Sequence, residues 1–303
     1  MWFKRKLSYS RYVAVECLAD GLAVVVQNGL DRASFSHVSF TRCEPEAQHH
    51  VLKQLVQEHG LKGLPCSLVL STDQYLSQTL ERPNVEPSEL AQAVRWKIRD
   101  YVEGDLSQWV VDSFPLPDAA TRGRPQVVAV MARRTLIERM LGVVRASGLE
   151  LDAIDIASLA LRNLLALQEV DASQPQSVFW ARDHEAIVLM CRDHDIYLAR
   201  QVDADLAGLA DPAQQEWVGQ NLALEVQRSL DYFESQLRQR PPRFLHVLSN
   251  AHLDVLMRQL DSGLALDVRV LDVPGVELEL AGDVALAAGA ALRHVRLAGE
   301  QAA

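Results

Sequence analysis

Residues 83–111 read Pro-Asn-Val-Glu-Pro-Ser-Glu-Leu-Ala-Gln-Ala-Val-Arg-Trp-Lys-Ile-Arg-Asp-Tyr-Val-Glu-Gly-Asp-Leu-Ser-Gln-Trp-Val-Val, and they predict a helix between two turn signals. Pro87 suits the first helical turn, because the N–H that it lacks would be unpaired there, and Gly104 suits the helix end. The pattern therefore predicts a helix of about four turns. Apolar residues at spacings of four, four and three give it one packing face: Leu90, Val94, Ile98 and Tyr101.

Trp96 lies off this packing face, beside Gln92 and Arg99. Two interpretations stay open for it. In the first, Trp96 anchors a partner protein, and Arg95 and Arg99 hold a polar or acidic group of that partner. Trp96, Arg95, Arg99 and Gln92 then form a partner-binding surface. In the second, Trp96 packs against neighbouring strands and touches no partner, as large aromatic side chains commonly do.

Length and composition indicate a globular protein with room for two domains. The chain has 303 residues, of which 49% are hydrophobic and 23% are charged. The net charge of −10 and the isoelectric point near 5.4 argue against nucleic acid as a partner, because binding to phosphates needs a basic face.

The cysteines and the N-terminus bear on the cellular compartment. No Cys-x-x-Cys pair occurs among the four cysteines, which favours a reducing compartment over a zinc site or a disulfide framework: Cys17, Cys43, Cys66 and Cys191. No apolar run is long enough to span a bilayer, so we expect a cytoplasmic protein. Residues 1–6, Met-Trp-Phe-Lys-Arg-Lys, suit contact with anionic lipid. Because so short a segment binds weakly, we favour a solvated tail.

The first half of the chain predicts a series of strands and helices. Asp20-Gly21 and Asn28-Gly29 are tight-turn pairs that separate three strands. The predicted elements are strands at 11–18, 22–27 and 33–40, a helix at 46–58, strands at 67–70 and 75–80, the helix described above, strands at 108–114 and 126–131, a helix at 135–146, a strand at 149–154 and a helix at 157–168. Residues from about 73 to 131 form a strand-helix-strand-strand unit, which we interpret as an inserted subdomain.

The second half repeats this order without the insertion. The predicted elements are strands at 177–180, 185–191 and 195–202, a long helix at 216–239, a strand at 243–248, a helix at 252–260, a strand at 266–271 and a helix at 283–295. We predict an α/β protein with a duplicated βββαβαβα order, which is the order of the actin-like (ribonuclease-H-like) fold. The domains are a tail at 1–10, a first domain at 11–170 that includes the insertion, and a second domain at 175–303 whose last helix packs back toward the first.

Four stretches resemble the PilM/MshI family of type IV pilus assembly proteins: Leu90–Val102, Gly148–Ala157, Leu224–Phe233 and Ala285–Arg293. Trp96-Lys-Ile98 and Gln227-Arg-Ser-Leu-Asp-Tyr232 are the most specific parts. The resemblance is greatest to MshI, the member associated with mannose-sensitive haemagglutinin (MSHA) pili, and it implies an actin-like fold with an inserted subdomain.

The resemblance also implies a place in the cell and a set of partners. Proteins of this family are similar in being cytoplasmic and peripheral to the inner membrane. The implied partner is a PilN-like single-span inner-membrane protein, whose N-terminal cytoplasmic tail docks between the core and the inserted subdomain. The pilus motor ATPase is a further candidate partner, and contact with the membrane is expected to be mainly indirect.

Nucleotide-binding proteins of this fold cradle the phosphates on Asp-x-Gly turns, because glycine lets backbone N–H groups approach and aspartate organises Mg²⁺. Two turns of this chain place other residues at these positions: Glu16 and Leu18 in the first, and Arg182 and Asp183 in the second. A third turn, which is Gly-Gly in those proteins and lets the adenosine lie flat, carries Ser249 and Asn250 here. We therefore expect no ATP hydrolysis, no catalytic residue, no metal ligand and no cofactor. Residual binding of ATP and Mg²⁺, with Glu16 and Asp183 as metal ligands, stays open.

Other polar pairs carry little catalytic signal. His49-His50 are adjacent on a predicted helix, where metal ligands need a spacing of three or four. The pairs 183–184 and 193–194, both Asp-His, flank one hairpin; their histidines could lie close together, but we favour turn residues. Arg228 and Asp231 are interpreted as a salt bridge within a helix or between domains.

Three functions are considered. The first is a cytoplasmic actin-like scaffold or adaptor of an MSHA-type pilus machine. The alternative is an ATP-binding or ATP-hydrolysing protein of the actin and kinase fold. The third is a filament-forming protein, which needs self-complementary surfaces. The three altered turns favour the adaptor.

Overall fold

The structure is a computed structural model, and it describes residues 10–121, 123–168, 171 and 173–295. Residues 1–6, which suit either a lipid contact or a solvated tail, lie outside the described residues. Within the described part of the chain, no helix is both long and apolar enough to cross a membrane.

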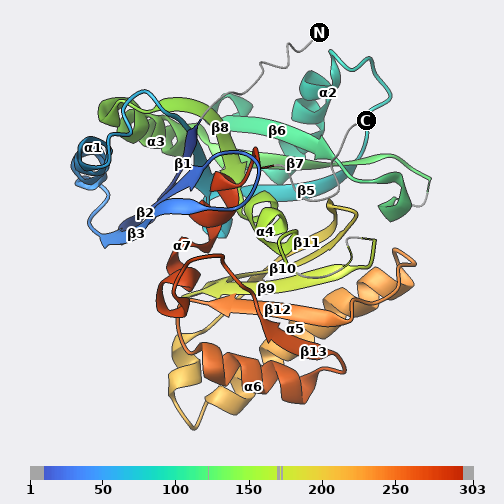
Figure 1. Ribbon diagram of the computed structural model, residues 1–303. Coiled ribbons are helices and arrows are strands. Elements are labelled where there is room, and N and C mark those ends of the chain that lie inside the picture. Colours follow the sequence, from blue (N-terminus) through green and yellow to red (C-terminus); the bar gives the residue numbers. More distant parts are fainter. Residues whose placement is uncertain (1–9, 122, 169–170, 172, 296–303) are drawn as a thin grey trace.

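The first lobe is built on a five-stranded sheet in the order β3-β2-β1-β4-β8 (Figure 1). Its strands are β1 (Arg11–Cys17), β2 (Gly21–Asn28), β3 (Phe35–Arg42), β4 (Pro65–Leu70) and β8 (Glu150–Ile156). β1, β2 and β3 form an antiparallel meander, whereas β4 and β8 run parallel to β1. β4 is buried along its whole length, as expected of a parallel strand covered on both faces. The covering helices on the outer face are α1 (Gln48–Glu58) and α3 (Arg134–Ser147).

The second lobe repeats this sheet in the order β11-β10-β9-β12-β13. Its strands are β9 (Gln176–Arg182), β10 (Glu185–Arg192), β11 (Asp195–Asp203), β12 (Phe244–Ser249) and β13 (Asp267–Val270). Here β9 takes the place of β1, because it pairs antiparallel with β10 and parallel with β12. The helices on the outer face are α5 (Gln215–Ser235) and α6 (Leu253–Gly263).

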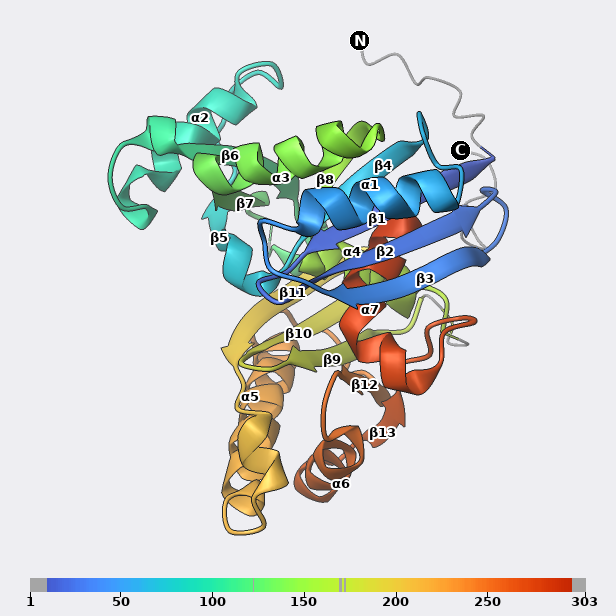
Figure 2. The ribbon, with the colours of Figure 1, turned by 90° about the vertical axis from the view of Figure 1, so that its left-hand side faces the viewer.

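Two helices, α4 (Ala157–Leu165) and α7 (Leu278–Ala291), lie between the two sheets (Figure 2). α7 contacts β1 and β2 of the first lobe and β9 and β12 of the second. The two helices touch at Gly289, where an added Cβ would lie 2.1 Å from the carbonyl oxygen of Ala160. Asn163 Nδ2 donates to the Gly289 carbonyl at 2.9 Å. The small residues of α7 therefore let one apolar core run through both lobes.

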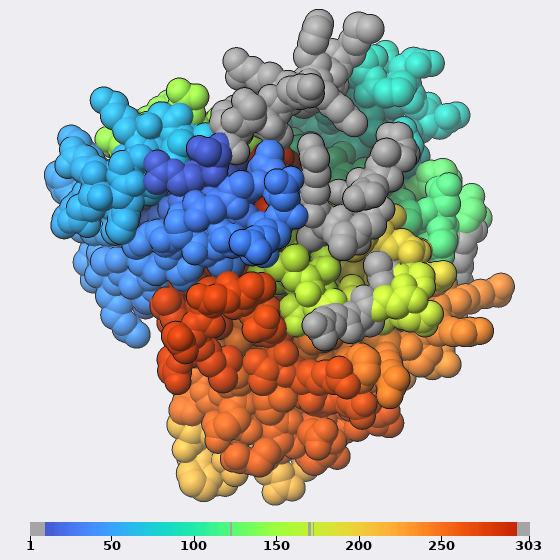
Figure 3. Space-filling model, viewed as in Figure 1, coloured from blue at the N-terminus to red at the C-terminus, as the bar shows by residue number. Residues whose placement is uncertain are grey.

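The inserted subdomain is a three-stranded antiparallel sheet in the order β5-β7-β6, packed against one short helix. Its elements are β5 (Leu76–Glu81), α2 (Leu90–Lys97), β6 (Trp109–Pro115) and β7 (Gln126–Arg133). Val94 and Ile98 are buried in its separate core, as the sequence predicts. Figure 3 shows the teal and green residues of this unit at one side of the molecule, above the orange second lobe.

The predicted four-turn helix is wrong in length. α2 has eight residues and passes into a 3₁₀ turn at Ile98–Tyr101. Arg95 donates to the carbonyl oxygens of Leu106 and Trp109. These bonds fold the following segment back over α2, so the helix cannot continue to Gly104. Tyr101 leaves the packing face and is 50% exposed.

The last helix also differs from the prediction, because α7 begins at Leu278 rather than at residue 283. Leu280 packs against the central core and Ala281 is buried in it, so burial extends the helix toward its N-terminus. The acidic Glu279 in the first turn is favoured by the helix dipole.

Candidate functional site

The first and second of the three turns meet at one cleft of about 890 Å³ between the two lobes. Leu18 lies in the turn after β1, Asp183 lies in the turn after β9, and both line this interlobe cleft. The equivalent positions of β1 and β9 in the two sheets bring their ends to the same place. Ser71 and the 3₁₀ turn Thr72–Gln74, which follow β4, form another wall.

Glu16 and Arg182 join the lobes at the floor of the cleft. Glu16 is fully buried, Arg182 is 3% exposed, and Arg182 Nη2 lies 2.6 Å from Glu16 Oε1. Ser71 Oγ donates to the same carboxylate oxygen at 2.8 Å and accepts from Arg182 Nη2 at 2.8 Å. Arg182 Nη2 also lies 2.9 Å from Glu185 Oε1. The Arg182 guanidinium thus binds Glu16 and Ser71 across the lobe boundary, and Glu185 within its own lobe.

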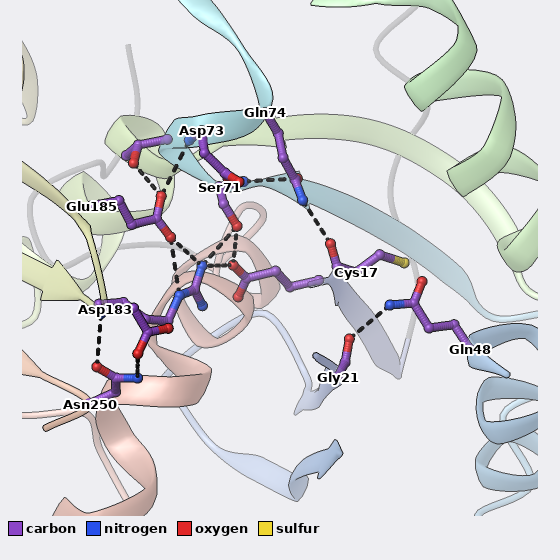
Figure 4. Close-up of polar contacts among 12 residues, drawn as sticks. Cys17, Gly21, Gln48, Ser71, Asp73, Gln74, Asp183, Glu185 and Asn250 are labelled. Carbon is purple, nitrogen blue, oxygen red and sulfur yellow. Dashed lines mark hydrogen bonds and ion pairs between the residues drawn. The ribbon is translucent and has the colours of Figure 1, made fainter. Parts of the chain in front are cut away.

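Glu185 carries the network to the cleft wall (Figure 4). Its Oε2 accepts from the hydroxyl of Thr72 and, at 3.3 Å, from the backbone N–H of Asp73. Gln201 Nε2 of β11 donates to the Thr72 carbonyl at 3.0 Å. The turn after β4 is therefore bound to the second lobe at several points. We call Glu16, Ser71, Thr72, Arg182 and Glu185 the interlobe clasp.

For Glu16 and Arg182 of the clasp, burial and the neighbouring opposite charge have opposite effects on the pKa. Burial raises the pKa of the Glu16 carboxyl, and the Arg182 guanidinium opposes that effect. Burial alone would lower the pKa of Arg182, but the carboxylates of Glu16 and Glu185 outweigh it and raise it. Arg182 is therefore a permanent cation. Burial and Glu185 raise the pKa of the neighbouring Asp73.

Leu18 is 8% exposed and belongs to the central core. Its N–H donates to the Gly21 carbonyl at 3.0 Å. Two glutamines fasten this turn (Figure 4): Gln48 Nε2 donates to the carbonyls of Leu18 and Gly21, and Gln74 Nε2 donates to the carbonyl of Cys17. The backbone carbonyls of this turn therefore accept hydrogen bonds from side chains of the protein itself.

The other two turns contact each other. Asp183 has a φ of 51°, its N–H donates to Asn250 Oδ1, and Asn250 Nδ2 donates to its Oδ1, each at 3.3 Å (Figure 4). Ser249 Oγ donates to the Ala251 carbonyl at 2.8 Å. α7 closes on this turn, because a Cβ added at Gly282 would lie 2.3 Å from the Ser249 carbonyl oxygen.

Both acidic and basic side chains line the cleft, but its arginines are paired with carboxylates of the protein itself. Arg182 is held in the clasp, and Arg200 and Arg228 both pair with Glu225. Arg228 therefore forms a salt bridge within α5, as predicted, but its partner is Glu225 and not Asp231. Asp231 instead accepts from Gln227 Nε2 at 2.7 Å.

Of the predicted partner-binding residues, Gln92, Arg95 and Trp96 lie on α2 and Arg99 lies in the 3₁₀ turn that follows it. None of them lines the interlobe cleft. Trp96 is 61% exposed, so its interpretation as a packed residue of the subdomain is wrong. Gln92 and Arg99 are also exposed. Arg95 is occupied by carbonyls of its own subdomain, which removes it as a free group for a partner.

The histidines do not converge. Asp183-His184 and Asp193-His194 lie at opposite ends of β10, whose eight residues span roughly 25 Å. Proximity of these histidines is therefore excluded, and positive φ values at Asp183, Asp193 and His194 confirm turn residues. The rings of His49 and His50 on α1 lie beside each other, with centroids 3.8 Å apart and planes inclined by 39°. Among the residues that the structure describes, no group of three or more His, Cys, Asp or Glu side chains could hold a metal ion.

Five residues of this site were not predicted from the sequence: Gln48, Ser71, Thr72, Gln74 and Glu185. Ser71 has a recognisable local signal, because Ser71 and Gln74 form a capping box at the 3₁₀ turn. Gln48 has no such signal, since its role depends on where α1 lies over the turn after β1.

Comparison with known proteins identifies solved structures of similar fold. No protein-family model matches the chain, and no curated protein sequence matches it. A solved structure described as the PilM-PilN type IV pilus biogenesis complex matches with a TM-score of 0.73 and 19% identity, covering 94% of this chain and 98% of that one.

Two further solved structures are similar. A Bacteroides thetaiotaomicron protein with an actin-like ATPase fold and unknown function gives a TM-score of 0.56 at 10% identity, over 94% of this chain and 99% of that one. The cytoplasmic domain of EpsL, an inner membrane component of the type II secretion system of Vibrio cholerae, gives 0.51 at 12% identity, over 91% and 94%. The chain therefore has an actin-like α/β fold similar to that of PilM, as the repeated order of its elements predicts.

Proposed function

We propose that this protein is a scaffold of a type IV pilus assembly machine, and that it binds the N-terminal cytoplasmic tail of a single-span inner-membrane protein. The observation that carries the proposal is the likeness to the PilM-PilN complex, which extends over almost the whole of both chains. The four similar sequence stretches favour an MSHA-type system. On this proposal the protein is cytoplasmic and reaches the inner membrane through its partner, with the pilus motor ATPase as a further contact.

We further propose that the protein is not an ATPase and needs no cofactor. The clasp supports this, because Glu16 and Arg182 are paired and buried where two phosphate-binding turns would meet. Leu18 adds a branched side chain to the first turn, and Gly282 packs against the third. The paired arginines of the cleft leave little to attract a triphosphate.

Capture from solubilised inner membranes tests the adaptor function. Tagged protein is expected to retain a single-span protein with a short cytoplasmic N-terminus, and removal of that tail from the partner should abolish retention. Retention of the tail-deleted partner at the full level would contradict the proposal. An unfolded sample is excluded as a cause of failure by a cooperative thermal transition of the same preparation.

A further inference from the structure

The segment that joins α5 to β12 is rich in arginine and contains no acidic residue. From Arg238 it reads Arg-Gln-Arg-Pro-Pro-Arg, and its three arginines, Arg238, Arg240 and Arg243, are all exposed. Arg269 is also exposed, and it lies on β13, which pairs with the first residues of β12 (Figure 1). We call Arg238, Arg240, Arg243 and Arg269 the arginine patch.

The ring of Phe244 brings two members of the arginine patch together. The Cζ atom of Arg269 lies 3.4 Å from the centroid of this ring, and that of Arg243 lies 5.0 Å from it. These cation–π contacts hold both guanidinium groups at the start of β12. Arg240 and Arg238 precede Arg243 by only three and five residues. The four charges therefore gather at one end of the second lobe.

The backbone beneath the arginine patch is fixed in place. Gln239 Oε1 accepts from Arg192 Nη1 at 3.1 Å, and Gln239 Nε2 donates to the carbonyl of Ala119 at 3.2 Å. Pro242 is buried, and each of the two prolines restricts its own φ to about −65°. Because the arginines extend from a stiff segment, binding through them costs less backbone entropy than binding through a flexible loop.

The arginine patch is a local positive surface on an acidic protein. No salt bridge within the part of the chain that the structure describes involves any of its four members. By contrast, the arginines of the interlobe cleft all pair with carboxylates. The whole chain has 40 Asp and Glu against 30 Lys and Arg. The patch therefore offers its charge to an anion from outside the chain.

The chemistry of the arginine patch favours phosphate groups on an extended surface. Guanidinium groups present paired N–H donors to phosphate oxygens and are more weakly hydrated than ammonium groups. The members of the patch are exposed, and none of them lines the interlobe cleft. A single small anion would touch few of them, whereas a layer of phosphates contacts all four at once.

We propose that the arginine patch binds the phosphates of anionic phospholipids and sets which end of the protein faces the membrane. The choice of lipid rests on the proposed function above, which brings the protein to the inner membrane. Each basic residue near an anionic leaflet strengthens binding by roughly fivefold, so the patch adds to the attachment that the partner supplies. The acidic remainder of the protein is repelled by the same lipid, and this repulsion turns the patch toward the membrane.

Co-sedimentation of the full chain with phospholipid vesicles tests the arginine patch without the partner. At low salt, wild-type protein is expected to bind phosphatidylcholine vesicles that contain phosphatidylglycerol, and to bind pure phosphatidylcholine vesicles far less. Arg243→Gln with Arg269→Gln should weaken binding to the anionic vesicles roughly 25-fold. Arg238→Gln with Arg240→Gln, which leaves the contacts of Phe244 intact, should weaken it to the same extent.

The matched control is Arg42→Gln with Arg258→Gln. It removes the same number of charges, but from exposed arginines that pair with carboxylates, so it should bind the vesicles like wild type. Residues 1–6 are present in every variant, and any contribution of that basic segment is the same in all of them. Equal losses in the patch and control variants, or equal binding to both kinds of vesicle, would overturn the proposal.

Polyglutamate and duplex DNA serve as alternative ligands. If binding to either depends on the arginine patch while binding to vesicles does not, the patch recognises an acidic protein or a nucleic acid, and the proposal is wrong. Because no partner is present, a negative vesicle result leaves the adaptor function standing. A failed capture from solubilised membranes together with patch-dependent vesicle binding would instead refute the adaptor function alone.

Discussion

The buried pair of Glu16 and Arg182 is the residue-scale feature on which the interlobe contact depends. Arg182→Met should leave the Glu16 carboxyl buried without its counter-charge, at a cost of about 3–5 kcal/mol in the free energy of unfolding. The double variant Glu16→Gln with Arg182→Met should recover much of this loss, because the one carboxylate that it leaves without a cation, Glu185, is 18% exposed rather than fully buried. Urea unfolding monitored by circular dichroism measures both. A loss below about 1 kcal/mol for the single variant would show that the pair is solvated.

Substitution of Trp96 distinguishes an effect on partner binding from an effect on stability. Because its side chain is 61% exposed, Trp96→Ala should leave the melting temperature nearly unchanged. If α2 is a partner surface, the same change should weaken capture of the membrane partner by about 2 kcal/mol. Trp217→Ala is the matched control, because Trp217 is 66% exposed on α5. Equal effects of the two substitutions on capture would argue against a role for α2.

His246 should make stability depend on pH. It is 4% exposed, its Nδ1 lies 3.2 Å from the Ser177 carbonyl, and burial lowers its pKa from the ordinary value of 6.5. The unfolded chain then binds this proton more readily, so the stability present above pH 6.5 is lost as pH falls below it. Melting temperatures between pH 7.5 and pH 5.5, a range of about one unit on either side of the ordinary value, should fall less for His246→Gln than for wild type. Parallel curves would contradict this assignment.

Among the helices, Gly289 and Gly142 differ in the space that an added Cβ would find. Gly289→Ala would drive a Cβ to 2.1 Å from the Ala160 carbonyl oxygen, so α4 and α7 must separate. We expect a loss of about 1–3 kcal/mol or more in the free energy of unfolding. Gly142→Ala on α3 is the control, because its Cβ meets no atom within 4 Å, and it should stabilise the protein by up to about 1 kcal/mol. Equal melting temperatures for both variants would contradict the tight contact.

The elements also indicate what sequence can predict. The order of strands and helices along the chain followed from local signals, such as the Asp20-Gly21 turn and the short apolar run of β4, and these agree with the fold. The end of α2 could not be predicted in this way. It depends on hydrogen bonds from Arg95 to the carbonyls of Leu106 and Trp109, and the apolar periodicity of the helix carries no information about such contacts. Likewise, the sequence marked Glu16 and Arg182 as altered turn residues but not as partners, since 166 residues separate them.

At the scale of the whole molecule, the clasp links two lobes that meet around a cleft. In nucleotide-binding proteins of this fold, the phosphates and their metal bridge turns of both lobes. Here side chains make that bridge, from Glu16 and Ser71 to Arg182, and from Thr72 to Glu185. On the proposed function, these bonds hold the lobes together without a nucleotide, so that the protein presents a constant surface to its partners.

We therefore propose that this actin-like protein works without nucleotide, and isothermal titration calorimetry with Mg-ATP measures whether ATP still binds. Wild-type protein is expected to give no saturable heat at any temperature where it is folded. Saturable binding with a Kd near 1 μM, which corresponds to about −8 kcal/mol, would contradict the claim and show that the altered turns still hold ATP.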